Sequence, residues 1–277
     1  MKTLLHPTDF SENSLNALDY AIEFCQHSGA ELLLVHAYGS PYDLSNRSED
    51  EVSVREKAIE SMERLIEDVL DDPDNVDIEC KTIVSGGSPM KTVLEIATEY
   101  RVDMIVMGTK GSSDLDNVIF GSTTAEVILE ADCPVMAVPD GTEFSDIKHL
   151  AYATDYREED LPIIWNLIQI ATYLDANLHL IYLAKESSLE EDLMFRGFRD
   201  LIRERFQYQY LRFELIYGED FIKSVHDYAG KFEGIVLAMG HYRTNILNSL
   251  SKREMVKQMA NHTRIPLLVM PELSVES

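Results

Sequence analysis

The chain contains the same order of apolar segments twice. L-L-H-P-T-D-F at 4–10 matches L-A-Y-A-T-D-Y at 150–156, and the next strand-like segment repeats at the same offset of 146 residues. Further on, P-V-M-A-V-P at 134–139 matches P-L-L-V-M-P at 266–271, at an offset of 132 residues. A connection that is 14 residues shorter in the second half explains the change of offset. The fold must therefore be one that a chain can build twice in tandem.

Within each half, short apolar runs alternate with segments of helical periodicity. This alternation is typical of repeated β-α units around a mainly parallel sheet. The expected strands lie at 3–7, 32–37, 76–84, 104–107 and 135–138, and near 149–153, 178–183, 211–217, 235–239 and 267–270. The predicted fold class is α/β, with two tandem five-stranded parallel-sheet domains. Their predicted bounds are 1–140 and 147–273, joined by the polar stretch 140–147.

Helix starts and inward-facing stripes are predicted from capping residues and apolar spacing. Ser11 is a candidate N-cap, and Ser88 with Pro89 fits the cap and first position of a later helix. A fourth helix is expected at 122–130. The side chains expected to face inward on the first two helices are Leu15, Leu18, Ile22 and Cys25, then Val54, Ala58, Met62, Leu65 and Val69.

Composition excludes several classes of protein. The net charge of −25 is uneven, because residues 1–140 carry 28 acidic and 9 basic side chains. The electrostatic field of so negative a protein repels nucleic acid and anionic membranes, so neither is an expected partner. No run of 18 apolar residues occurs, and the three cysteines form no C-x-x-C pair. These features predict a cytoplasmic protein with reduced thiols.

The most informative local motif follows the fourth expected strand. There the chain reads M-G-T-K-G-S-S-D-L-D-N-V-I-F-G-S-T-T, with glycines spaced G-x2-G-x9-G before a helix start. Glycines allow backbone N–H groups to approach an anion, and the free N–H groups of the following helix add to the same site. The sequence therefore predicts a phosphate site, with Lys110 between the first two glycines. In so acidic a half, a polyphosphate needs a compensating cation, for which Mg2+ is expected.

Several residues have alternative interpretations. Asp9, at the end of strand one, is either a turn and capping residue or a ligand contact. Lys110 is either a solvated loop lysine or a phosphate contact. His6 and His36 are interpreted as structural. Neither a P-loop nor a G-x-G-x-x-G fingerprint is present, and the sequence has no H-E-x-x-H or G-x-S-x-G motif.

The second half has lost most of the glycine motif. Gly240 remains, while Arg243, Arg253 and Glu254 occupy the positions of the other glycines and of the serine at the helix start. Arginine brings bulk where backbone would touch phosphate, and glutamate would repel it. The second half is interpreted either as a degenerate copy that supports the first or as a site for a different ligand, since two arginines can face an acid or phosphate.

The first half resembles the universal stress protein family. The resemblance rests on P-T-D-F-S-E-N-S, L-L-L-V-H-A, G-T-K-G-x9-G-S-T-T-A-E-V-I and C-P-V-M-A-V-P, which together span that half. It implies an adenine-nucleotide alpha-hydrolase-like sheet of strand order 3-2-1-4-5. It also implies ATP binding in members that keep G-x2-G-x9-G-[ST]. The second half resembles the same family through T-D-Y and its closing strand.

The resemblance also implies roles for residues of this chain. Pro7, Thr8 and Asp9 would meet the adenosine, and the backbone of Ala37 would hydrogen-bond the adenine. Met107 would pack beneath the nucleotide. The residues expected to hold ribose and phosphates are Gly108, Gly111, Gly121, Ser122 and Thr123.

Three functions follow as hypotheses. The first is an ATP-binding regulatory stress protein, in which binding rather than turnover is the output. The second is a slow ATP hydrolase, disfavoured because no general base stands out beyond Asp9 and Asp114. The third is a nucleotide-free assembly protein.

Members of the family commonly dimerise through the last strand. In a tandem chain the two halves either make this contact with each other, as a pseudo-dimer, or use it to form a homodimer. The acidic segment 43–72 is either a lid or a solvated face.

Overall fold

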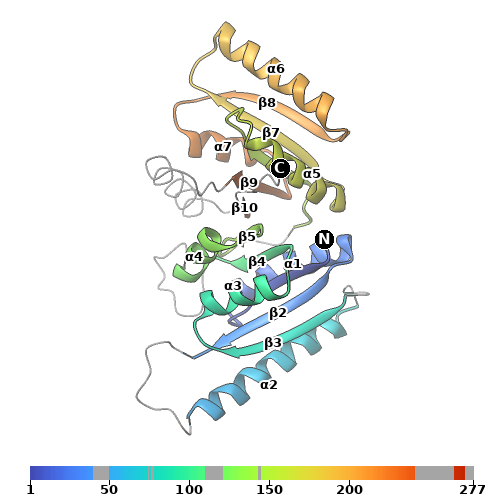
Figure 1. Cartoon of the computed structure of the whole chain (residues 1–277), viewed down its shortest axis with the longest axis vertical. Coiled ribbons are helices and arrows are strands. Elements are labelled where there is room, and N and C mark those ends of the chain that lie inside the picture. The colour runs from blue at the N-terminus through green and yellow to red at the C-terminus, as the bar shows by residue number, and fades with distance from the viewer. Residues whose placement is uncertain are drawn as a thin grey trace. The chain divides into compact units, whose positions relative to one another are not determined.

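The chain folds into two compact units, Met1–Phe144 and Ser145–Ser277, shown in Figure 1. The structure is a computed structural model. It describes residues 1–39, 50–73, 75, 78–109, 121–142, 145–240 and 265–271. Among these residues no helix is both long enough and apolar enough to cross a membrane.

The first unit alternates strands and helices along the chain (Figure 1). Its elements are β1 (Thr3–Pro7), α1 (Glu12–Ser28), β2 (Glu31–Tyr38), α2 (Asp50–Asp71), β3 (Cys80–Gly86), α3 (Pro89–Glu99), β4 (Met104–Gly108), α4 (Ser122–Glu130) and β5 (Val135–Val138). All four strand pairings are parallel, and they give the order β3-β2-β1-β4-β5. The predicted α/β class and strand order are confirmed.

The second unit repeats this topology. Its elements are β6 (His149–Ala153), α5 (Asp160–Tyr173), β7 (Asn177–Ala184), α6 (Leu189–Arg205), β8 (Leu211–Tyr217), α7 (Phe221–Ala229), β9 (Ile235–Gly240) and β10 (Leu267–Met270). Parallel pairings give the order β8-β7-β6-β9-β10. Each half of the chain therefore builds the same five-stranded sheet.

Burial explains why the inner strands are the most apolar. All five residues of β4 are buried, and so are all four of β5. An inner strand of a parallel sheet is covered on both faces, so it reads as a continuous apolar run. The edge strand β3 is half-buried or exposed at every position.

Helix α1 begins and ends as its sequence predicts, but its buried face differs from the predicted stripe. Ser11 is the N-cap and accepts a hydrogen bond from the Ser14 N–H, and Gly29 closes the helix in the left-handed conformation. Leu15, expected to face inward, is 39% exposed, because the small residues Ala17 and Ala21 share the buried face with the larger side chains. Val54 on α2 is likewise exposed, whereas the other four predicted apolar residues of that helix are buried.

Candidate functional site

The strand order creates a switch point between β1 and β4. These strands lie side by side, with Leu4 opposite Met104 and Leu5 opposite Ile105. From β1 the chain crosses over to β2 on one side, whereas β4 continues to β5 on the other side. In open parallel sheets, ligands collect at such a point beyond the carboxyl ends of the strands. Here those ends are Pro7 and Gly108.

The turn after β1 is held rigidly by backbone and side-chain hydrogen bonds. The buried Thr8 donates its N–H to the carbonyl of Val35 at 2.8 Å, and His36 donates from Nδ1 to the carbonyl of Thr8 at 2.8 Å. Phe10 has a φ of 62°, and its N–H donates to Thr8 Oγ1 at 3.0 Å. A left-handed conformation at a bulky residue is strained, and such strain concentrates at functional sites.

Asp9 helps to start helix α1. Its Oδ1 accepts the Ser11 N–H at 3.1 Å and the Ser11 hydroxyl at 2.6 Å. Asp9 therefore acts as a turn and capping residue, which was one of the two alternatives for it. The carboxylate remains half-buried beside the end of β1.

A buried polar chain lies beneath this turn. His6 is fully buried and donates from Nδ1 to the carbonyl of Val106 at 2.9 Å. Ser14 Oγ lies 3.4 Å from His6 Nε2 and 2.9 Å from Thr8 Oγ1. Burial lowers the pKa of His6 to about 4, although its bond to Val106 and the charge of Asp9 act in the opposite direction. The imidazole is therefore neutral and structural.

Packing around the end of β4 requires a glycine at position 108. A Cβ placed on it would lie 2.5 Å from Asn13 Oδ1 and 2.9 Å from the Asn13 carbonyl oxygen. Thr124 of α4 donates its hydroxyl to the Gly108 carbonyl at 2.8 Å. Helices α1 and α4 thus both contact the end of β4. The sequence analysis explained this glycine by the approach of a phosphate and did not predict its contact with Asn13.

The start of α4 has the features of an anion site. Gly121 is the N-cap, and its N–H donates to the carbonyl of Thr109 at 2.6 Å. Ser122 is exposed and Thr123 is half-buried, and the first turn contains no acidic residue or side-chain cap. The first N–H groups of a helix lack intrahelical partners and lie at its positive dipole end. This helix end can therefore accept an anion.

Two further predicted residues lie on the neighbouring strands. Ala37 is two residues beyond Val35, the last residue of β2 that pairs with β1. Because backbone groups of alternate residues face the same neighbour, those of Ala37 face the space beyond the end of β1. Met107 is buried and pairs with Ala137 within the sheet.

Nine of the eleven predicted site residues lie in the described part of the chain, at the carboxyl ends of β1, β2 and β4 and at the start of α4. Lys110 and Gly111 lie outside it. Among the described residues, no group of three or more histidine, cysteine or acidic side chains could hold a metal ion.

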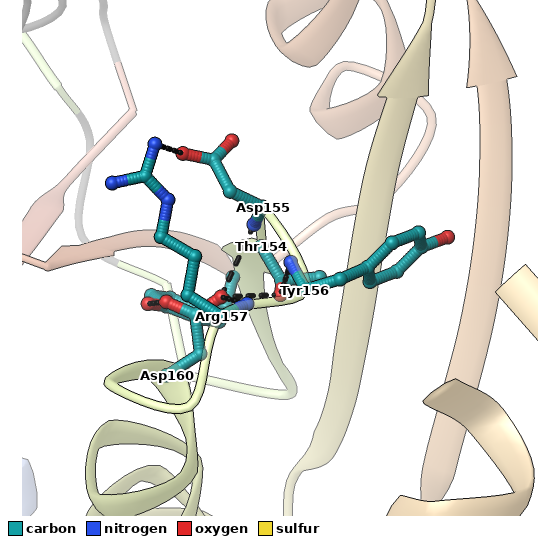
Figure 2. A network of polar contacts seen from close by, with 6 residues as sticks. Thr154, Asp155, Tyr156, Arg157 and Asp160 are labelled. Atoms are coloured by element: carbon teal, nitrogen blue, oxygen red, sulfur yellow. Dashed lines mark hydrogen bonds and ion pairs between the residues drawn. The ribbon is translucent and has the colours of Figure 1, made fainter. Parts of the chain in front are cut away.

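The second unit has the same turn, but different side chains stabilise it. Figure 2 shows the polar contacts of this second turn. Tyr156 has a φ of 60°, and its N–H donates to Thr154 Oγ1 at 3.0 Å, as Phe10 does with Thr8. The buried Asp160 stands where Ser14 stands in the first unit. Its carboxylate accepts the Tyr152 hydroxyl at 2.7 Å, the Thr154 hydroxyl at 2.6 Å and the Asp155 N–H at 3.1 Å.

The sequence interpretation missed this network, although the offset of 146 residues that aligns Thr8 with Thr154 also aligns Ser14 with Asp160. An aromatic pair stands beside it. The ring of Tyr156 stacks on Tyr182 with centroids 3.9 Å apart, at the positions of Phe10 and His36 in the first unit. Arg243, Arg253 and Glu254 lie outside the described residues.

Several known proteins are similar to this chain. A universal stress protein of Thermus aquaticus is 32% identical over 147 residues, covering 50% of this chain and 98% of the relative. The crystal structure of a universal stress protein from Archaeoglobus fulgidus has a TM-score of 0.72 and 18% identity, covering 99% of this chain and 97% of that one, and so shares its fold. A universal stress protein solved in complex with cAMP is 27% identical over 50% of this chain and 96% of its own, with a TM-score of 0.38.

The sequence model of the universal stress protein family matches residues 1–139. These residues contain the switch point, the strained turn and the start of α4. The chain belongs to the universal stress protein family.

Proposed function

We propose that the first half binds ATP with Mg2+ beyond the carboxyl ends of β1 and β4. The proposed function is regulatory: bound nucleotide would alter the conformation or the partner contacts of the protein. The observation that carries this proposal is the start of α4, an uncapped helix end without acidic residues, tied to the end of β4 at the switch point. Residues 1–140 carry a net charge of −19, so this helix end is a local exception in an acidic half. A polyphosphate bound there needs the cation as a counter-charge.

The proposed contacts follow from the positions of the predicted residues. Adenosine would lie against the turn from Pro7 to Asp9, with the adenine beside the backbone of Ala37. Phosphates would meet the free N–H groups of Ser122 and Thr123. The remaining proposed contacts are Met107, Gly108, Lys110, Gly111 and Gly121.

The proposed division of labour makes the first domain, 1–140, the binding domain and the second, 147–273, its structural or regulatory support. In the second unit Asp160 accepts N–H groups of the turn, and the Tyr156 ring stacks on Tyr182. A buried carboxylate under this turn disfavours an anionic ligand there. This difference supports a binding site in one half only.

Substituting Ser122 tests the phosphate contact without disturbing packing, because its side chain is exposed. Ser122→Glu copies the residue of the second half. We expect ATP affinity to fall about tenfold or more, since a carboxylate would face the phosphates. We expect unfolding free energy to stay the same or rise by about 0.3–1 kcal/mol, because an acidic residue in the first turn favours the helix dipole. Calorimetric titration with ATP and Mg2+, together with urea unfolding, measures both.

Ser122→Gln is the matched control, since glutamine has the shape of glutamate without its charge. It should retain most of the affinity. Equal affinity of the glutamate variant and the original protein would refute the phosphate assignment. Turnover above about 1 per second would instead favour the hydrolase. Absence of any ATP binding by the original protein would favour the nucleotide-free assembly protein.

A further inference from the structure

Two histidines and a tyrosine form a hydrogen-bonded chain on one face of the second sheet. His149 opens β6, and His179 lies on the neighbouring strand β7, where it pairs with Ala151. His149 Nδ1 and His179 Nε2 are 3.0 Å apart. His179 Nδ1 and the hydroxyl of Tyr228 on α7 are 2.7 Å apart. The chain thus runs from the start of β6 across β7 to the helix that packs on this face.

The chain is shielded from water at one end and open at the other. His179 is fully buried and Tyr228 is nearly so, whereas His149 is half-buried. The ring of Phe232 lies edge-on to that of His179, with centroids 4.8 Å apart. The centroids of the Phe232 and His149 rings are 5.0 Å apart. Of these three side chains, His149 is therefore the most exposed to solvent.

Charged groups lie near the chain on β8, just before β6 and just after α7. Arg212 on β8 pairs directly with His179, and Lys148 precedes His149, so both oppose an added proton. Glu214, two residues along β8, interacts with the Tyr228 hydroxyl, and the Lys231 ammonium lies 5.4 Å from the centre of the Tyr228 ring. Burial, Arg212 and the neighbouring histidine together hold the pKa of His179 at about 4, and burial also lowers the pKa of His149.

The donor and acceptor pattern of the chain admits one extra proton. With both rings neutral, Tyr228 can donate to His179 Nδ1 while His179 Nε2–H donates to His149 Nδ1. When His149 gains a proton, its Nδ1–H must donate to His179 Nε2. His179 then carries its hydrogen on Nδ1 and donates to the Tyr228 oxygen, and the Tyr228 hydroxyl turns to the carboxylate of Glu214. A second proton would place two N–H groups face to face at 3.0 Å and break the bond.

We propose that His149, His179 and Tyr228 form a proton-binding site in which the gain of a single proton by His149 reverses each hydrogen bond of the chain and moves the hydrogen of His179 from Nε2 to Nδ1. The protonated chain holds one hydrogen more than the neutral chain, on His149 Nδ1, and this proton comes from water; His179 and Tyr228 each keep a single hydrogen. The site lies in the second half and is independent of the nucleotide proposed for the first. Through this site the second half, which lacks the glycine motif, would respond to pH.

The test is an NMR titration of the full chain that reads the protonation and tautomer of each histidine ring between pH 7.5 and 3.5. We expect the hydrogen of His179 to move from Nε2 to Nδ1 at the same midpoint at which His149 gains its proton. A His179 tautomer that stays unchanged while His149 titrates would overturn the proposed coupling. This readout uses the unmodified protein, so it does not depend on any variant folding.

Tyr228→Phe removes the last acceptor of the chain and keeps the ring. The protonated state would then leave the buried Nδ1–H of His179 without a partner, so we expect the His149 midpoint to fall by about one pH unit, a tenfold loss of proton affinity. Tyr208→Phe is the control, because its hydroxyl bonds the Ala176 carbonyl outside the chain. Equal His149 midpoints in the two variants would contradict the proposal.

Discussion

At the scale of single residues, the same strained turn is stabilised by different chemistry in the two units. Phe10 and Tyr156 both adopt a left-handed backbone conformation above a threonine hydroxyl. Beneath the first turn is the neutral pair of Ser14 and His6, and beneath the second is the carboxylate of Asp160. A buried carboxylate is tolerated only with donors around it, which makes Asp160 the most sensitive residue of the second turn.

Asp160→Asn should destabilise the second unit by roughly 2–3 kcal/mol. The carboxylate accepts two hydroxyls and the N–H groups of Asp155 and Arg157, as Figure 2 shows, and an amide would face some of these donors with its own N–H2 group. Urea unfolding followed by the fluorescence of Trp165, the single tryptophan, reports on the second unit because this residue lies on α5.

Asp155→Asn is the matched control for this measurement. Asp155 is exposed and forms a 3.5 Å ion pair with the exposed Arg157, so its loss should change stability by less than about 1 kcal/mol. Similar losses for both variants would mean that the buried network does not stabilise the turn.

At the scale of elements, two glycines show how position decides the effect of the same substitution. Gly108 ends β4 against the side chain and carbonyl of Asn13 on α1. Gly197 lies within α6, where an added Cβ would have no neighbour within 4 Å. Close packing of a helix against a strand end requires the first glycine, whereas nothing within the described structure requires the second.

Opposite changes in stability are therefore expected from Gly108→Ala and Gly197→Ala. The first should cost about 1–3 kcal/mol, because the new methyl group would push Asn13 and its backbone away. The second should add about 0.5–1 kcal/mol, because alanine is the better helix former. Chemical denaturation of the two variants beside the original protein measures both. A neutral Gly108→Ala would show that α1 moves away at little cost.

At the scale of the whole molecule, one histidine in the described part of each unit is fully buried and has a low pKa. The pKa of His6 and that of His179 are both lowered from 6.5 to about 4, chiefly by burial. At pH values between about 4 and 6.5, these two histidines bind more protons in the unfolded chain than in the folded chain. Stability is therefore greatest above pH 6.5 and falls as the pH decreases towards 4.

Lowering the pH from 7 to 5 should reduce the unfolding free energy by roughly 2 kcal/mol for each of the two histidines. Circular dichroism in urea at several pH values measures this decrease. His6→Asn provides the control, because the amide can still donate to the Val106 carbonyl but does not titrate. A slope unchanged in this variant would exclude His6 as a cause.

Much of the fold could be predicted from the sequence. Inner strands are buried on both faces and are therefore apolar runs, and each run ends sharply at a polar turn. The bounds of β1, α4, β5, β6, β8 and β10 agree with the predicted ranges. The inward position of Leu15 was wrong, since periodicity identifies a helix face only approximately where small residues share it. For the candidate site, the sequence indicated the residues at the strand ends and the start of α4.

The sequence by itself determined the duplication, the α/β class and the loss of the glycine motif in the second half, because these depend on local pattern. The strand order was implied by the family resemblance. Only the tertiary structure decided why Gly108 lacks a side chain, what supports each strained turn and that His149, His179 and Tyr228 form one chain. The physical reason is that these contacts join residues distant in sequence. Their partners are chosen by packing across strands and helices, which no local pattern records.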